Sequence, residues 1–185
     1  MIIRTLSGLN SLLPEEREEM VSLCRECFLE PPRRETFFYN TISTYFEWIF
    51  SVPDVISILC LSDQGQVIGA SFAYPVLHNQ EISDFLVKKG IEDQSKIIYL
   101  AELFVRKERR KEGIGKALHR LRIIIAKMRG MNFAVERTSP ASKMFSIILE
   151  DGFTPIGGME VVSLKNISGI QIMVPDAMVV SIKKM

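Results

Sequence analysis

The sequence is poor in cysteine, and the cysteines it has do not form a disulfide or zinc framework. Cys24, Cys27 and Cys60 are an odd number, and the CxxC made by the first two lacks the second pair or histidine cluster of a zinc site. The helical pattern around Cys24 and Cys27 favours buried core positions over a redox or metal role. We therefore expect free thiols in a reducing compartment and no bound metal.

Long apolar runs and flexible linkers are also missing. No run of about 18 apolar residues occurs, and the N-terminus lacks a basic segment followed by an apolar one. Neither a membrane span nor secretion is indicated, so we expect a cytoplasmic protein. No repeat or Ser/Gly/Pro-rich linker divides the 185 residues, and 47% of them are apolar. These features predict one domain over residues 1–185.

Net charge is nearly absent, but the positive charge is unevenly distributed. The formal charge of +1 excludes a general attraction of the whole protein for nucleic acid or anionic membranes. The segment from Arg106 to Arg129 nevertheless holds ten of the 23 lysines and arginines and only two acids. It begins with RKERRKEGIG, a basic run that ends in Gly113 and Gly115. Any affinity for anions must therefore be local to this segment.

Hydrophobic periodicity and turn residues predict an α/β (α+β) chain. An almost continuously apolar strand is predicted over 97–105, with Glu102 as its one acid, followed by an amphipathic helix over 114–128 that ends before Gly130. Two β-rich runs, 55–61 and 66–75, predict a hairpin around SDQG. The other predicted elements are a strand over 1–5, helices over 14–29 and 33–50, a helix inside the polar insert 78–96, a strand over 132–139, a helix from Ser139 and Pro140 to Asp151, and closing antiparallel strands over 159–164, 170–174 and 178–182.

The basic loop between the apolar strand and the helix favours anion binding. Backbone N–H groups converge at such a helix start, and glycines let an anion approach the backbone closely. The alternative without a ligand is a charged turn that is only solvated. A nucleic-acid patch is disfavoured because no aromatic, Asn or Gln residue is interleaved between Arg106 and Arg129. The loop fits neither a P-loop nor a Rossmann fingerprint. Pyrophosphate binding on a different scaffold is the preferred interpretation.

Two segments resemble motifs of the GNAT acyltransferase superfamily. LAELFVRKERRKEGIGKAL, Leu100 to Leu118, resembles its acyl-CoA-binding strand, R/Q-x-x-G-x-G/A loop and helix. RTSPASKMFSIILEDGF, Arg137 to Phe153, resembles the motif that follows, in which a helix ends in Gly-Phe. The resemblance implies a mixed, mostly antiparallel sheet that is flanked by helices and splays between its fourth and fifth strands, with acyl-CoA in the gap.

The resemblance also implies which residues would hold the cofactor, and it implies no metal. Backbone groups of three strand residues would pair with the pantetheine arm, and N–H groups of the loop would hold the diphosphate. These residues are Leu103, Phe104 and Val105 on the strand, and Arg110, Lys111, Glu112, Gly113, Ile114, Gly115 and Lys116 in the loop and helix start.

Glu102 is the candidate catalytic residue. Many GNAT members have an acid at this position, so the resemblance implies that Glu102 accepts a proton from an amine, directly or through water. An inert, hydrogen-bonded carboxylate is the alternative. Side-chain alternation puts Glu102 on the face of Leu100 and Phe104, unless a bulge interrupts the strand.

The proton donor is less clearly indicated. Family members often have a tyrosine four residues before the glycine of Gly-Phe, and Ile148 occupies that position here. Tyr74, Tyr99, water or positioning alone would have to serve instead. His119 is expected on the solvated side of its helix, and His78 follows a strand end near the mouth of the site. The aromatic residues of 37–48 either line the acceptor side or pack against the sheet.

The predicted function is an N-acetyltransferase that moves an acetyl group from acetyl-CoA to a primary amine in a ternary complex. A small-molecule acceptor is favoured over a protein amine, because the insert 78–96 could close over a compact site. A catalytically silent acyl-CoA sensor is the alternative, motivated by Ile148, and a nucleic-acid-binding domain is the other rival. We expect no nucleic-acid or membrane partner, and the sequence leaves both a monomer and a homodimer open.

Overall fold

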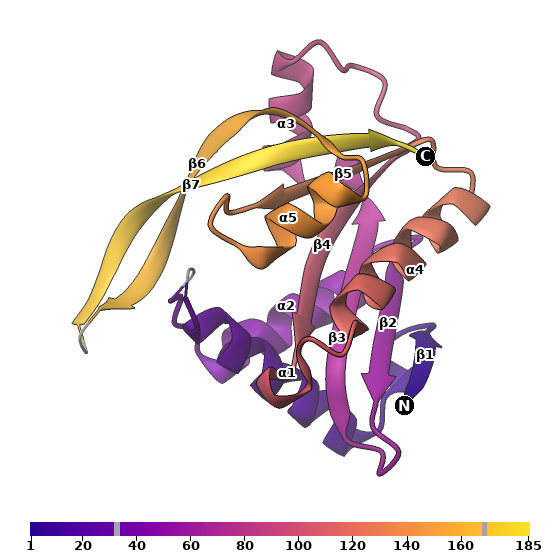
Figure 1. The fold of residues 1–185 in the computed structure, drawn as a ribbon, viewed down its shortest axis with the longest axis vertical. Helices are drawn as coiled ribbons and strands as arrows, with labels where there is room; N and C mark the ends of the chain where they lie inside the picture. Colours follow the sequence, from indigo (N-terminus) through magenta and orange to yellow (C-terminus); the bar gives the residue numbers. More distant parts are fainter. Residues whose placement is uncertain (32–33, 168–169) are drawn as a thin grey trace.

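The fold is a single twisted sheet with helices on both faces (Figure 1). The structure, a computed structural model, describes residues 1–31, 34–167 and 170–185. Within these residues the sheet has seven strands in the order β1-β2-β3-β4-β5-β7-β6, and only the β4–β5 pair is parallel. The predicted mixed, mostly antiparallel sheet is therefore confirmed. The strands are β1 (Ile2–Leu6), β2 (Ile56–Leu61), β3 (Val67–Pro75), β4 (Ile97–Val105), β5 (Phe133–Thr138), β6 (Thr154–Ile167) and β7 (Ile170–Lys184).

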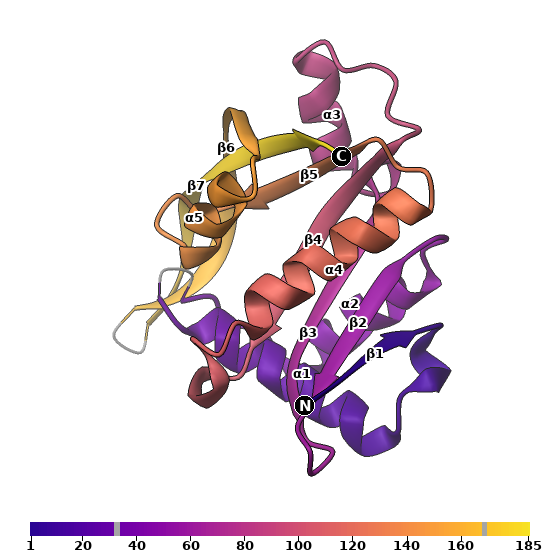
Figure 2. The same cartoon turned by 45° about the vertical axis from the view of Figure 1, so that its right-hand side comes forward.

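Helices pack on both faces of the sheet (Figure 2). Helices α1 (Pro14–Leu29), α2 (Tyr39–Ser51) and α3 (Gln80–Lys88) contribute to one apolar core, and α4 (Ile114–Met128) and α5 (Lys143–Glu150) to the other. No helix in the part of the chain that is described is long and apolar enough to cross a bilayer.

Local sequence explains the elements that were predicted well. Pro14 occupies the first turn of α1, and the Glu16 carboxylate accepts the N–H of Leu13 at 2.9 Å, so the helix start is capped. The hairpin of β2 and β3, the strand β4 and the start and end of α4 lie where the sequence places them, to within a residue.

Three predicted boundaries are wrong. Helix α5 begins at Lys143 rather than Pro140, because the hydroxyl of Ser142, not Ser139, caps it by accepting the N–H of Met144 at 3.1 Å. Helix α2 begins only at Tyr39, because the extended chain before it pairs with α1 through the N–H of Glu35 and the carbonyl of Phe28, at 2.8 Å. The last two predicted tail strands are one strand, β7, which pairs with β6 along its length.

The sheet divides between β4 and β5. Their parallel pairing runs from Ile97 opposite Phe133 to Leu100 opposite Glu136 and then stops. Beyond Leu100 the two strands separate, which Figure 1 shows as an opening between β4 and β5. The predicted splay between the fourth and fifth strands is therefore present.

An aromatic cluster joins helix α2 to the sheet before this opening. The ring centroid of Phe46 lies 5.2 Å from that of Phe72 on β3 and 6.1 Å from that of Phe104 on β4. Phe46 is 1% exposed. Residues of α2 also line the cavity described in the next subsection, so this packing holds that side of the cavity against β4.

Replacing Phe46 with alanine should therefore destabilise the fold strongly. Loss of a buried phenylalanine costs about 3 to 5 kcal/mol of unfolding free energy, through lost transfer energy and a residual cavity. Urea denaturation of the purified variant measures the loss. Phe38→Ala is the control, because Phe38 is 71% exposed, and it should change stability by less than about 0.5 kcal/mol. Equal losses in the two variants would contradict this account of the packing.

Candidate active site

A β-bulge in β4 determines where the Glu102 side chain lies. In the β3–β4 register Ser71 faces Leu103 and Ala73 faces Leu100, so two β4 residues, Ala101 and Glu102, lie opposite one β3 residue. The extra residue shifts the alternation of side chains along the strand. The bulge that would interrupt the alternation is therefore present, and Glu102 does not share the face of Leu100.

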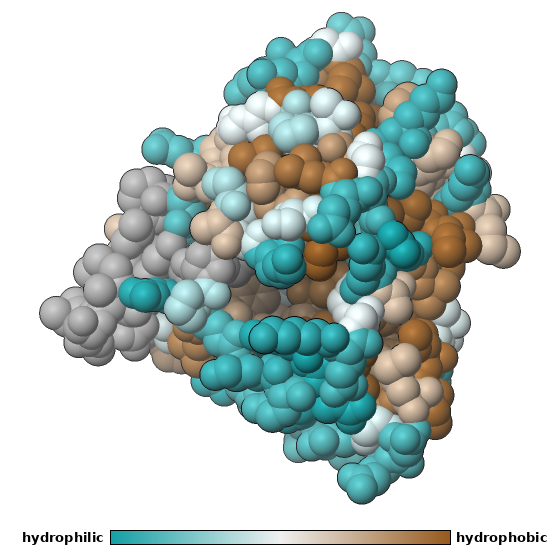
Figure 3. Space-filling model, in the orientation of Figure 1, coloured by the Kyte–Doolittle hydropathy of each residue, from teal (hydrophilic) through white to brown (hydrophobic). Residues whose placement is uncertain are grey.

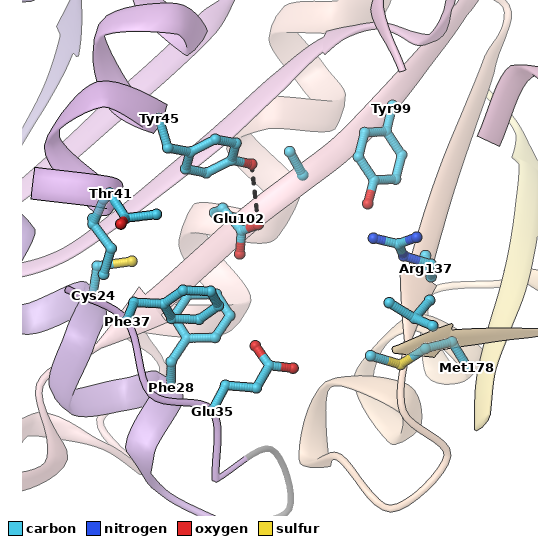
Figure 4. A pocket seen from close by; sticks show the side chains of 13 residues that line it. Cys24, Phe28, Glu35, Phe37, Thr41, Tyr45, Tyr99, Glu102, Arg137 and Met178 are labelled. Atoms are coloured by element: carbon cyan, nitrogen blue, oxygen red, sulfur yellow. Dashed lines mark hydrogen bonds between the residues drawn. The ribbon is translucent and has the colours of Figure 1, made fainter. Parts of the chain in front are cut away.

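Glu102 instead faces helices α1 and α2. Leu100 and Leu103 pack in the core beneath α4, whereas Ala101 and Phe104 pack in the core beneath α1 and α2. The Glu102 carboxylate lies on the second side, where it accepts a hydrogen bond from the hydroxyl of Tyr45 at 3.2 Å (Figure 4). Burial, and next the Glu102 carboxylate, raise the pKa of Tyr45, so this hydroxyl stays protonated and donates.

A cavity of about 370 Å³ opens beside Glu102. Figure 4 shows Tyr45 and Glu102 on one wall, with Tyr99 and Arg137 opposite them. The guanidinium of Arg137 pairs with Glu81 of α3 at 2.5 Å, which ties the inserted helix to this wall. The lining residues are Cys24, Phe28, Glu35, Phe37, Thr41, Ile42, Tyr45, Tyr99, Ala101, Glu102, Arg137, Val161 and Met178.

A second, narrower hollow occupies the opening between β4 and β5. It has a volume of about 100 Å³ and is lined by Leu103 and Phe104 of β4, by Glu136 and Thr138 of β5, and by Cys27 of α1. Figure 3 shows this face of the molecule hollowed at its centre, with a hydrophobic floor and hydrophilic residues around it. The residues that line both hollows are Phe28, Ala101, Glu102 and Arg137. Glu102 therefore lies where the cleft between the strands meets the cavity.

The loop before α4 presents a row of free backbone donors. Gly113 is the N-cap with φ +82°, and the first helical N–H that finds a carbonyl is that of Ala117, which bonds to Gly113 at 2.9 Å. The N–H groups of residues 111–116 meet no acceptor in the described part of the chain. A glycine with positive φ followed by a helix start is a geometry that gathers such donors around an anion.

The basic side chains of the loop are directed elsewhere. Arg110 donates to the carbonyl of Val105 at 2.9 Å and pairs with Glu30, and Lys116 pairs with Glu150 at 3.1 Å. Gly115 has no positive φ, and a β-carbon there would lie at an ordinary contact distance, 3.7 Å, from side chains of β4. None of the loop residues lines either hollow, but Arg110 joins the loop to the end of β4 and to Cys27, which lines the cleft.

The residues considered as proton donors differ in position. Tyr99 lines the cavity. Tyr74 does not line it, and its hydroxyl accepts from the Asn79 amide at 3.4 Å. Ile148 is fully buried in the core under α4, and His78 is exposed and lines neither hollow.

Of the aromatic residues before and in α2, two line the cavity and the others do not. Phe37 and Tyr45 line it, Phe46 is buried in the core, and Trp48 and Phe38 are exposed. Some aromatic residues of this segment therefore line the cavity, and another packs against the sheet, as the two alternatives allowed.

Two of the three cysteines lie at the site, and Cys60 lies away from it on β2. Cys24 is buried and lines the cavity, as its predicted core position allows, and Cys27 is partly exposed and lines the cleft. Burial raises the pKa of the Cys27 thiol, so it is mostly protonated at neutral pH. No group of three His, Cys, Asp or Glu side chains among the described residues could hold a metal ion.

A buried polar cluster beneath the bulge was not predicted. His119, expected on the solvated side of α4, is 0% exposed, which makes that expectation wrong. Its Nδ1 lies 3.2 Å from Arg122 Nη2, and its Nε2 lies 3.6 Å from Asp151. Arg122 is also fully buried and donates to the Glu136 carboxylate at 3.1 Å. The signal in the sequence was the spacing Ile114, Leu118, Arg122, Ala126, which puts Arg122 on the buried face of α4.

Comparisons with known proteins agree with this geometry. The sequence profile of the Acetyltransferase (GNAT) family matches residues 17–145, which include the strand, loop and helix from Leu100 to Leu118. No curated protein sequence matches the chain.

Solved structures share the fold at low identity. A ribosomal-protein-alanine N-acetyltransferase from Brucella melitensis has 14% identity and a TM-score of 0.69, covering 100% of both chains. A phosphinothricin acetyltransferase from Sinorhizobium meliloti, in complex with AcCoA, has 16% identity and a TM-score of 0.69, covering 100% of this chain and 89% of that one. Arabidopsis thaliana NAA60, in complex with acetyl-CoA, has 16% identity and a TM-score of 0.69, covering 100% and 98%.

The buried histidine predicts a pH dependence of stability. Burial, and next the charge of Arg122, lower the pKa of His119 to about 3, against about 6.5 in an unfolded chain. Between these values the unfolded chain binds a proton that the folded protein does not, so the free energy of unfolding falls as the pH falls. From pH 7.5 to 4.5 the contribution of His119 is a loss of about 2.5 kcal/mol. Urea denaturation across this range measures it, and His119→Gln should flatten the slope. A variant as pH-sensitive as the natural protein would contradict the assignment.

Proposed function

Because the chain belongs to the GNAT acetyltransferase family, we propose that it transfers an acetyl group from acetyl-CoA to a primary amine on a small molecule, with Glu102 as the base. Acetyl-CoA use and N-acetyltransferase activity are properties of the family. The observation that carries the proposal for Glu102 is its position at the junction of the cleft and the cavity. A group at that junction can contact both the acetyl donor and the amine.

The residues predicted to hold the cofactor fit a coenzyme A diphosphate and its arm. The free N–H groups of Lys111, Glu112, Gly113, Ile114, Gly115 and Lys116 would bind the diphosphate. The expectation that the Arg110 N–H joins them is wrong, because that N–H bonds to the carbonyl of Lys107 at 3.3 Å. Leu103, Phe104 and Val105 continue β4 past its last pairing with β5, so β5 leaves this edge of the strand open to the pantetheine arm. The Val105 carbonyl on this stretch already accepts from Arg110 at 2.9 Å. Acetyl-CoA supplies the thioester, whose carbonyl carbon forms the new bond to nitrogen.

Glu102 would make the acceptor nucleophilic. An alkylammonium ion with a pKa near 10.4 must lose a proton before its nitrogen can attack. The Glu102 carboxylate takes that proton, directly or through water, while the Tyr45 hydroxyl holds it in place from α2. The nitrogen loses its second proton as the C–N bond forms and the C–S bond breaks. That proton would neutralise the departing thiolate, and the Tyr99 hydroxyl on the opposite wall of the cavity would carry the transfer.

The cavity supports a compact acceptor. It is walled by four aromatic side chains and contains the carboxylates of Glu35 and Glu102, which together suit an ammonium group on an apolar or aromatic body. The ion pair of Glu81 with Arg137 ties helix α3 to the cavity wall. A protein substrate would need a more open approach, so a small amine is the preferred acceptor.

Removing the base tests the proposal. Glu102→Gln keeps the size of the side chain but removes its basicity, so kcat should fall by about 10²- to 10³-fold while the Kd of coenzyme A stays within about threefold of its original value. Thiol release from acetyl-CoA with a panel of small primary amines measures kcat. Glu26→Gln, on the exposed side of α1, should behave like the natural protein. Coenzyme A binding without turnover on any amine would favour the acyl-CoA sensor instead.

Replacing Gly113, the N-cap of α4, tests the proposed diphosphate site. Gly113 and Gly65 both have φ +82°, and at neither position would an added β-carbon have another atom within 4 Å. Alanine should therefore cost similar backbone strain at both positions, about 1 kcal/mol. Gly113→Ala should weaken coenzyme A binding by about fivefold or more, as measured by calorimetry, whereas Gly65→Ala, in the β2–β3 turn, should leave it unchanged. Equal effects on coenzyme A affinity would count against the site.

A further inference from the structure

One buried guanidinium contacts three neighbouring strands at the point where the sheet divides. Arg122 of α4 is 0% exposed. Its Nη1 donates to the carbonyl of Phe72 on β3 at 3.2 Å and to the carbonyl of Glu102 on β4 at 3.4 Å. Its Nη2 donates to the carboxylate of Glu136 on β5 at 3.1 Å.

These contacts lie at the β-bulge in β4 and at the splay between β4 and β5. Phe72 is the β3 residue that faces the bulged pair Ala101 and Glu102. Glu136 is the last residue of β5 that pairs with β4. The guanidinium therefore occupies the point at which the bulge begins on one side and the splay on the other.

The carbonyls at the bulge need a hydrogen-bond donor from outside the β3–β4 ladder. Regular pairing is interrupted at Glu102, and a buried carbonyl that loses its ladder partner must find another donor. A planar guanidinium presents several N–H groups in a fixed fork, so it can hold two carbonyls and a carboxylate at once. The Glu136 carboxylate balances the buried charge, and His119 is neutral at ordinary pH because its pKa is low.

We propose that Arg122 is the positioning residue for Glu102. By holding the bulge carbonyls from the α4 side, Arg122 keeps the Glu102 carboxylate on the opposite side of the sheet, against Tyr45 and the cavity. Without the bulge, regular alternation would turn Glu102 toward the face of Leu100, beneath α4, and away from the acceptor. This inference rests on the proposed role of Glu102 as the base.

A double-mutant cycle tests the inference. Arg122→Lys keeps a positive charge near Glu136 but loses the fork, so kcat should fall by about 30-fold or more, with the Kd of coenzyme A within about threefold of its original value. In a Glu102→Gln background the same change should lower kcat by less than about threefold, because there is no base left to position. A purely structural role would lower kcat by the same factor in both backgrounds, and that result would overturn the inference.

A matched control shows whether the loss of kcat is specific to Arg122 or follows the loss of any arginine contact made from α4. Arg129 also donates from one nitrogen to two carbonyls, those of Asp54 at 2.8 Å and Val55 at 3.1 Å, but it lies at the exposed end of the helix. Arg129→Lys should leave kcat unchanged. An unchanged kcat in Arg122→Lys as well would overturn the inference.

A second variant covers the case in which Arg122→Lys does not fold, as judged by circular dichroism. Arg122→Met with Glu136→Gln removes both charges, so neither is left unpaired. This double variant is also measured with and without Glu102→Gln, and it should again lower kcat much more when Glu102 is present. If Glu102→Gln alone keeps full kcat, the proposed base is wrong and the positioning role falls with it. A loss in Glu102→Gln without coupling to position 122 overturns the positioning role alone.

Discussion

The hydrogen bonds of the buried Arg122 guanidinium lie at the division of the sheet, and the site is arranged around that division. Regular pairing on both sides of β4 would close the cleft and leave Glu102 facing α4. The bulge and the splay together free one edge of β4 and move one carboxylate to the other face of the sheet. A charged group so deeply buried is costly unless it is paired, and here it is paired with Glu136 and with two carbonyls.

The order of the chain explains why the proposed cofactor and acceptor sites adjoin. Strand β4 runs from the core to the basic loop, and α4 returns beneath the same strands (Figures 1 and 2). One continuous segment therefore contains the proposed base, the strand edge beyond the pairing with β5 and the row of backbone amides at the helix start. The other walls of the cavity come from α1, α2, β5, β6 and β7, beside Tyr99, Ala101 and Glu102 of β4.

Much of the fold could be predicted from the sequence, but the inner geometry of the site could not. Periodicity located β4 and α4, and the glycines of the loop indicated the turn with free backbone donors before α4, because these signals are local. The side of the sheet on which Glu102 lies depends on a bulge that only the pairing of β3 with β4 reveals. Arg122 and His119 look like surface residues by type, and their burial depends on which face of α4 meets the sheet. The helix start at Lys143 was missed because two nearby serines, Ser139 and Ser142, offered equally good caps.

The most direct test of the account is a crystal structure of the protein with acetyl-CoA bound. The account predicts diphosphate oxygens within hydrogen-bonding distance of the N–H groups of residues 111–116, the pantetheine arm along Leu103 to Val105, and the thioester at the junction beside Glu102. A cofactor bound outside the opening between β4 and β5, or one whose thioester lies on the α4 side of the sheet away from Glu102, would contradict it.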